Sequence, residues 1–303
     1  MRFLAIGECM AELAPAVTAD GFSLGFAGDT FNTAWYLARL RPETSVSFFT
    51  AIGADAISQK LRDAITAGGI DDSHVQVVPD RTIGLYMISL DNGERSFSYW
   101  RSQSAARQLA ADPQALERAM DQTDVIYFSG ITLAILDPAS RETLLAALRH
   151  ARAAGKTVAF DPNLRPRLWA DPAEMTRVVM QGAAVSDIAL PSFEDEASWF
   201  GDNDPEATAA RYADAGASTV VVKNGADPVF YRQGDVHGSA AVPALQSIVD
   251  TTAAGDSFNA AILAGMDDNT PLTHSITRAC RLAGSVVQSK GALIPVDSDG
   301  LDR

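Results

Sequence analysis

The feature that most constrains the fold is a repeated alternation of short apolar runs with longer segments of helical periodicity. The apolar runs end at Gly, Pro, Asn or Ser, as buried strands often do, and they lie at residues 3–7, 46–53, 124–130, 157–163, 187–192 and 218–225. Helical patterns lie between them at residues 30–40, 140–155 and 206–216. This alternation predicts parallel β-α-β units and an α/β fold with a doubly wound sheet. Ligands bind such sheets at the carboxyl ends of the strands.

One stretch interrupts the alternation. "IGLYMISLDNGERSFSYWR" (83–101) consists of two extended runs around Asn92-Gly93, a pair that favours a hairpin turn. Tyr86, Tyr99 and Trp100 lie on this hairpin, which predicts a lid over a binding site. A surface hairpin with edge aromatics remains the alternative.

Length and charge exclude several classes of function. A chain of 303 residues buries a large core, as one domain or two units, and no apolar stretch approaches the length of a membrane span. The net charge of −14 repels nucleic acid and anionic membrane, so neither is an expected partner. An acidic substrate would therefore need a site built from local arginines. The two cysteines, Cys9 and Cys280, indicate no disulfide framework and fit a reducing cytoplasm.

The chain does not match two common nucleotide-binding motifs. "HARAAGKT" (150–157) ends like a P-loop, but His150 replaces the first glycine and the segment leads into a strand where a P-loop leaves one. No Gly-x-Gly-x-x-Gly occurs in the chain, which counts against a dinucleotide-binding fold.

"DTTAAGDSF" (250–258) places two carboxylates around very small side chains at an expected helix start. The first amides of a helix lack intrahelical partners and carry the positive end of its dipole. The absence of bulk at Ala253, Ala254 and Gly255 lets an anion approach those amides closely. Asp256 beside the anion suits proton abstraction from an attacking hydroxyl, while the amides hold developing charge. A helix-capping role for Asp256 is the alternative.

This segment resembles the C-terminal signature of the PfkB/ribokinase family of carbohydrate kinases, usually Asp-Thr-x-Gly-Ala-Gly-Asp. The resemblance covers nearly the whole chain and implies one ribokinase-like kinase domain over residues 1–303. It implies a mainly parallel doubly wound sheet with helices on both faces, and a β-lid from about residues 10–24 and 83–101. Asp256 matches the catalytic base of the family. Ala253 replaces the usual first glycine and needs a backbone that tolerates its Cβ.

The other motifs of the family also have counterparts. "FAGDTFNTAWYLARL" (26–40) is similar to the sugar-binding motif and implies that Gly28, Asp29 and Asn32 contact the sugar; a plain helix cap at Asp29 is the alternative. The resemblance also assigns residues to the nucleotide and its anion turn: Asn163, Ser192, Lys223, Gly225, Thr252, Ala253, Ala254 and Gly255. "QSKGALIP" (288–295) resembles the loop that flanks adenine.

The acidic cluster "LPSFEDEASWF" (190–200) occupies the place of the Asn-x-x-Glu motif of the family, which supports Mg²⁺ mostly through water. Ser192 and Asp195 fall in its two positions, so the metal-supporting residue stays open between Asp195 and Glu196. A solvated first helical turn is the alternative. The implied cofactors are ATP, Mg²⁺ and a monovalent cation such as K⁺.

Within the family, the chain is most similar to members that phosphorylate the sugar acid 2-keto-3-deoxygluconate at its C6 hydroxyl. The resemblance implies that Tyr86, Tyr99, Arg101 and Arg165 hold the acid, and guanidinium forks bind carboxylates well. A structural salt bridge is the alternative for Arg165. Other readings are a kinase for another sugar, such as fructose, and a non-catalytic protein that binds a sugar acid. The resemblance also implies a homo-oligomer formed through the lid.

Overall fold

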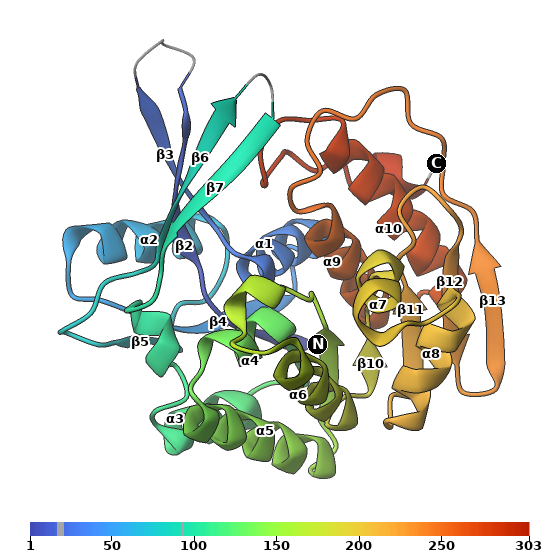
Figure 1. The fold of residues 1–303 in the computed structure, drawn as a ribbon, viewed down its shortest axis with the longest axis horizontal. Coiled ribbons are helices and arrows are strands. Elements are labelled where there is room, and N and C mark those ends of the chain that lie inside the picture. Colours follow the sequence, from blue (N-terminus) through green and yellow to red (C-terminus); the bar gives the residue numbers. More distant parts are fainter. Residues whose placement is uncertain (17–20, 92–93, 303) are drawn as a thin grey trace.

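The computed structural model describes residues 1–16, 21–91 and 94–302. Its main body is a nine-stranded sheet with the order β13-β12-β11-β10-β9-β8-β1-β4-β5 (Figure 1). Pairing is parallel from β11 to β5, and β12 and β13, at one end of the sheet, pair antiparallel. The expected mainly parallel α/β sheet is therefore confirmed.

The expected strands and helices fall within one or two residues of most of their predicted positions. The strands of the large sheet are β1 (Arg2–Ile6), β4 (Ser45–Ile52), β5 (Val75–Val77), β8 (Val125–Ser129), β9 (Thr157–Asp161), β10 (Ile188–Ala189), β11 (Thr219–Val222), β12 (Val229–Gln233) and β13 (Val236–Ala240). The α-helices are α1 (Asp29–Leu40), α2 (Ala56–Ala67), α3 (Pro113–Asp121), α4 (Gly130–Ile135), α5 (Pro138–Ala153), α6 (Pro172–Ala184), α7 (Phe193–Phe200), α8 (Pro205–Asp214), α9 (Ala254–Asp267) and α10 (Leu272–Val287). Short 3₁₀ helices span Ala105–Gln108, Pro166–Leu168 and Asp299–Asp302.

A second, four-stranded sheet stands apart from the first and has the order β3-β2-β6-β7 (Figure 1). It is formed by β2 (Met10–Pro15), β3 (Phe22–Ala27), β6 (Leu85–Asp91) and β7 (Glu94–Trp100). β2 pairs with β6 in parallel, and the two outer pairs are antiparallel. β2, β6 and β7 fall in the two segments predicted to form a small β-layer, and β3 extends three residues beyond the first of these segments. The predicted hairpin turn at 92–93, and residues 17–20 of the first segment, lie outside the described residues.

The helices differ in whether a side chain caps their N-terminus. Four helices begin with an aspartate whose side chain accepts amide hydrogen bonds, followed by proline at the first helical position: α3, α5, α6 and α8. By contrast, α1 begins after Gly28 and α9 after Ala253, and neither residue supplies a side-chain cap. In α1 the Thr30 amide donates to the Asp29 side chain over 2.8 Å, and in α9 the Ala254 amide donates to the Thr251 carbonyl over 3.3 Å. The amides of Gly255 and Asp256 in α9 remain without an intrahelical partner.

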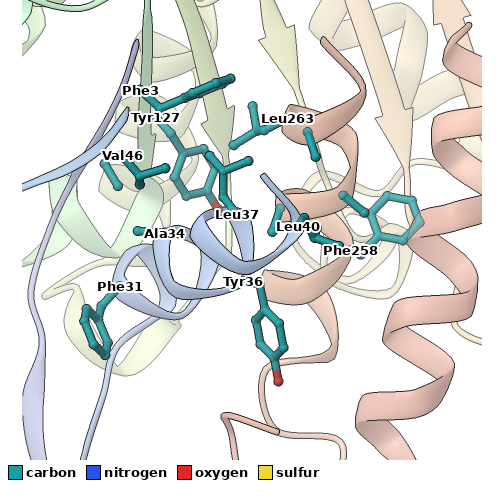
Figure 2. Close-up of a cluster of buried hydrophobic side chains, with 14 of the residues drawn as sticks. Phe3, Phe31, Ala34, Tyr36, Leu37, Leu40, Val46, Tyr127, Phe258 and Leu263 are labelled. Carbon is teal, nitrogen blue, oxygen red and sulfur yellow. The ribbon is translucent and has the colours of Figure 1, made fainter. Parts of the chain in front are cut away.

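The core beneath these two helix starts is continuous. Figure 2 shows Phe31, Leu37 and Tyr36 of α1 and Phe258 of α9 within one cluster of buried side chains that reaches the sheet. The Tyr36 hydroxyl donates to the Ala292 carbonyl over 2.8 Å, which ties α1 to the last loop. The packing fixes α1 and α9 relative to the strands. Among the described residues, no helix is long and apolar enough to cross a membrane.

Candidate active site

The residues that follow the parallel strands gather at one edge of the large sheet, as the topology requires. β1 is followed by Glu8, β9 ends at Asp161 and leads to Asn163, and β11 leads to Lys223. The starts of α1 and α9 lie at this same edge, because Asn163 contacts Asp29 of α1 and Lys223 lies beside Gly255 of α9. A hydrogen bond between Asn32 and Asp256 joins the two starts to each other.

The turn into α9 is an anion-binding geometry. Ala253 adopts a left-handed conformation with φ 61°, which explains why this position favours glycine; alanine accepts it at a cost of about 1–2 kcal/mol. Asp250 fixes the turn, because its side chain accepts hydrogen bonds from the amide and hydroxyl of Thr252 and from the amide of Gly291. The amides of Gly255 and Asp256 belong to the first helical turn and point out of α9.

Lys223 adds a positive charge beside this turn. A Cβ atom on Gly255 would lie 3.6 Å from the Lys223 ammonium nitrogen, so the lysine sits directly over the helix start. The ammonium contacts Asp161 at 3.3 Å and the side-chain oxygen of Asn259 at 3.2 Å. An anion at the turn would therefore meet backbone amides and an ammonium group together.

Asp256 stands at the edge of this positive region. Asn32 donates to its Oδ2 over 2.8 Å. The pKa of Asp256 is raised to about 8: burial is the main cause, the charge of Asp29 adds to the rise, and the hydrogen bond from Asn32 opposes it. A carboxyl group with this pKa accepts a proton readily near neutral pH, as a general base must.

Asp29 forms the second half of the acidic pair. It is 9% exposed, and its Oδ2 accepts a hydrogen bond of 2.8 Å from the side-chain amide of Asn163. Burial raises the pKa of Asp29, and hydrogen bonds from Ser129 and Asn163 oppose the rise. The structure therefore puts Asn163, which was predicted to serve the nucleotide, beside a residue predicted to contact the sugar.

A buried network of polar side chains, which the sequence analysis did not predict, lies next to Asp256 and Lys223. Asn259 donates to Asp161 Oδ2 over 2.8 Å and to the Tyr127 hydroxyl over 3.0 Å. Asn259 lies one helical turn after Asp256, and Asp161 ends β9. The i, i+3 spacing from Asp256 was the available signal for Asn259, since such residues share a helix face.

The second sheet contributes three of the predicted substrate residues. The Tyr86 hydroxyl donates to Glu12 Oε2, and its ring centroid lies 5.9 Å from that of Tyr99. Tyr86 also belongs to an apolar cluster against which Ala253 packs, so the sheet reaches the turn before Asp256. Arg101, directly after β7, forms an ion pair with Glu8.

Arg165 lies further out than Arg101. It is half exposed, donates to the carbonyl of Leu164 over 2.7 Å, and approaches Asp195 Oδ2 at 3.8 Å. Burial raises the pKa of Asp195, and the charge of Arg165 opposes that effect. Arg165 is therefore beside the acidic residue predicted to support Mg²⁺.

The two acidic candidates for metal support occupy different environments. Glu196 is 0% exposed; its Oε2 accepts from Arg211 over 2.8 Å and its Oε1 from Tyr212 over 3.0 Å. The start of α7 lies against Lys223, because the Phe193 amide donates to the Lys223 carbonyl over 2.8 Å, and the charges of Asp161 and Lys223 act on the pKa of Asp195. The geometry thus brings Asp195 to the site and keeps Glu196 in the protein interior. Within the described residues, no group of three or more His, Cys, Asp or Glu side chains forms a metal-binding cluster.

Two further predicted nucleotide residues, Ser192 and Gly225, lie near Lys223 in the structure or in the sequence. Ser192 pairs with Lys223 through a parallel bridge, and Gly225 has φ 60° in the turn after β11. A pocket of about 450 Å³ opens between residues 243–245, α10 and residues 295–301. Gln288 and Pro295, the ends of the segment predicted to flank adenine, line this pocket.

Comparison with known proteins finds similarity to carbohydrate kinases in sequence and in structure. A family model described as "pfkB family carbohydrate kinase" matches residues 2–299. The 2-dehydro-3-deoxygluconokinase of Escherichia coli K12 is 41% identical over 303 residues, with 97% of both chains covered. The enzyme of the same name from Dickeya dadantii is 38% identical, with 97% of this chain and 96% of the relative covered. The crystal structure of 2-dehydro-3-deoxygluconokinase from Thermotoga maritima superimposes with a TM-score of 0.85 at 21% identity, covering 100% of this chain and 98% of that one. At that identity the superposition supports the ribokinase-like fold alone.

Proposed function

The chain belongs to the pfkB family of carbohydrate kinases, and we propose that it transfers the γ-phosphoryl group of ATP to the C6 hydroxyl of 2-keto-3-deoxygluconate. The products are 2-keto-3-deoxy-6-phosphogluconate and ADP. The substrate, also called 2-dehydro-3-deoxygluconate, is the one that the names of the relatives from E. coli and D. dadantii specify.

The observation that carries this proposal is the placement of Asp256. Its carboxylate lies between a hydrogen-bond donor on α1 and the open amides of α9. A hydroxyl bound beside α1 is thereby presented to the base, and a phosphoryl group at the α9 turn is within reach of the same hydroxyl. Asp256 orients the C6 hydroxyl and takes its proton, while the amides of Gly255 and Asp256 and the Lys223 ammonium hold the charge that develops on the phosphoryl oxygens.

The sugar lies between α1 and the second sheet in this proposal. Gly28, Asp29 and Asn32 contact its hydroxyls, and Tyr86 and Tyr99 cover it from the lid. The guanidinium groups of Arg101 and Arg165 bind the carboxylate. The lid, formed by residues near 10–24 and 83–101 of a single kinase domain, excludes water, so that ATP is not hydrolysed.

The nucleotide lies on the other side of Asp256. Ser192, Lys223, Gly225 and Thr252 contact its phosphates and ribose, and the pocket beside α10 takes the base. Mg²⁺ bound to the phosphates would neutralise their charge, and Asp195 is the side chain placed to support it through water. The proposal also includes a monovalent cation such as K⁺.

The lid also suggests self-association in the cytoplasm. Four of its large side chains, Phe22, Phe97, Tyr99 and Trp100, are 40–56% exposed. Large apolar groups gathered on one small sheet favour pairing with a second copy. The free, buried Cys9 and Cys280 suit a reducing compartment.

The decisive experiment measures ADP release with Mg²⁺-ATP across a panel of sugar acids and neutral sugars. We expect the highest kcat/KM for 2-keto-3-deoxygluconate. Preference for fructose would establish the alternative sugar kinase, and tight binding of the acid with no turnover would indicate a binding protein.

A further inference from the structure

A buried ion pair joins the lid to the main body of the protein. Glu8, in the connection from β1 to β2, accepts a hydrogen bond at Oε2 from Nη2 of Arg101. The Glu8 side chain is 1% exposed and the Arg101 side chain 12%. Removing an ion pair from water to this degree costs free energy. A buried ion pair between these two segments therefore calls for a functional explanation.

The backbone around the pair is shaped to admit it. A Cβ atom on Gly84 would lie 2.9 Å from Glu8 Oε1 and 3.2 Å from Arg101 Cβ, so glycine makes room for both side chains. A Cβ atom on Gly28 would lie 2.1 Å from the Glu8 carbonyl oxygen, so the Glu8 backbone lies directly against the start of α1. Glu8 therefore touches both the lid arginine and the helix start that we assign to the sugar.

The pair is incompletely satisfied. Glu8 Oε1 and Arg101 Nε are both buried and lack a hydrogen-bond partner in the described part of the chain. Native proteins rarely leave such atoms unpaired, and the exceptions often mark sites of function. Because Glu8 contacts only one nitrogen of Arg101, the rest of the planar guanidinium fork is left for another acceptor.

We propose that Glu8 is a positioning residue for Arg101, and that it fixes the plane of the guanidinium so that the free edge meets the carboxylate of the sugar acid. The proposal rests on the function proposed above. In a chain with net charge −14, a guanidinium without this anchor has many other carboxylates to pair with. The anchor thus keeps the group in a single orientation before the substrate arrives, which lowers the entropy lost on binding.

The test is a double-mutant cycle with Glu8→Ala, Arg101→Gln and the double variant, assayed with 2-keto-3-deoxygluconate and with fructose. We expect Glu8→Ala to raise KM for the acid by about 10–100-fold, the range seen when a partner that orients a metal ligand is removed. KM for ATP and kcat should change by less than about 3-fold, because the carboxylate is remote from the reacting hydroxyl. In the Arg101→Gln background, Glu8→Ala should add less than about 2-fold.

Two further variants separate positioning from folding. Glu8→Gln keeps an acceptor for Arg101 and should give an intermediate KM for the acid; it carries the test if Glu8→Ala does not fold. Glu174→Gln is the matched control, because it alters another largely buried arginine pair, Arg141–Glu174 at 2.8 Å, between α5 and α6. It should lower the melting temperature without changing the preference for the acid over fructose.

Three outcomes would overturn the proposal. Equal losses with the acid and fructose would make Glu8 a structural residue only. An undiminished effect of Glu8→Ala in the Arg101→Gln background would mean that it acts independently of Arg101, and a lower KM for the acid would mean that its charge repels the substrate. A wild-type enzyme that does not act on the acid would refute the proposed function itself, whereas normal wild-type activity with additive losses would refute the role of Glu8 alone.

Discussion

The side-chain amide of Asn32 donates a hydrogen bond to Asp256 Oδ2 over 2.8 Å, which joins α1 to the first turn of α9. The side-chain oxygen of Asn32 faces the amide of Gly28 at 3.4 Å, so its two ends contact both helix starts. The residue assigned to the sugar and the residue assigned to proton transfer thus form one unit.

Replacing Asp256 by Asn tests the base directly. The amide keeps the shape of the side chain but cannot take a proton, so kcat should fall by about 10²–10⁴-fold with little change in the KM of the sugar. Steady-state kinetics on the folded variant measures this. Retention of more than about a tenth of wild-type kcat would make Asp256 a helix cap.

The pH dependence of kcat/KM should show the same group. The pKa of Asp256 is raised to about 8, mainly by burial, so kcat/KM should rise with pH up to this region and level off above it. Asn32→Ala removes a hydrogen bond that lowers this pKa and should move the rising limb to higher pH. A profile that is flat between pH 6 and 9 would contradict this prediction.

Stability should depend on pH through the same carboxyl group. The pKa of this carboxyl group is 3.8 ordinarily and about 8 in the folded protein. Between these two pH values the folded state holds a proton that the unfolded state has lost. This contribution to stability is complete below pH 3.8 and is lost as the pH rises toward 8. Asn resembles the protonated form, so the melting temperature of Asp256→Asn should exceed that of wild type by a margin that grows from pH 5 to 8. Scanning calorimetry across this range provides the measurement, and a constant margin would exclude the shifted pKa.

Asp195 and Glu196 should respond differently to neutralisation. Asp195→Asn should raise the Mg²⁺ concentration for half-maximal activity by about 10-fold, with little effect on stability. Glu196→Gln should lower the free energy of unfolding by about 1–3 kcal/mol, because the hydrogen bond from Arg211 loses its charged acceptor. Magnesium titrations and denaturant unfolding on both variants distinguish these roles, and the reverse pattern would return the metal-supporting role to Glu196.

Arg165→Ala tests recognition of the acid. A charge-assisted hydrogen bond contributes about 1.5–3 kcal/mol, so kcat/KM for 2-keto-3-deoxygluconate should fall by about 10–150-fold. The loss with fructose should be much smaller, because fructose has no carboxylate. Equal losses on both substrates would indicate that Arg165 interacts with Asp195 or the phosphates and not with the substrate carboxylate. The 3.8 Å contact between Arg165 and Asp195 is compatible with that role.

The sequence predicted the layers of the fold and the turn at Ala253 because both depend on local patterns. Apolar runs and helical periodicity identify elements, and small residues before Asp256 identify an open helix start. It did not predict the contacts of Asn163 with Asp29 or of Glu8 with Arg101. These pairs lie 134 and 93 positions apart, and only the strand order and the packing of the second sheet bring them together.

Acidic residues next to a helix start look alike in a sequence. Asp195 and Glu196 are adjacent on α7, yet one faces the site and the other is 0% exposed against Arg211 and Tyr212. A helix turns about 100° per residue, so neighbours point in different directions, and the face that is buried is set by α8. No local pattern around residues 190–200 distinguishes the two.

The position of β1 in the large sheet has a consequence for synthesis on the ribosome. β1 pairs on one side with β4 and on the other with β8, whose residues begin at Val125. At a synthesis rate of about 5–20 residues per second, roughly 6–25 s pass between the synthesis of β1 and that of β8. During that time the apolar segment from Phe3 to Ile6 lacks β8, the strand that pairs with its second edge. The nascent chain therefore carries an unpaired edge of β1 until β8 is made, and misassembly through that edge is favoured during this period.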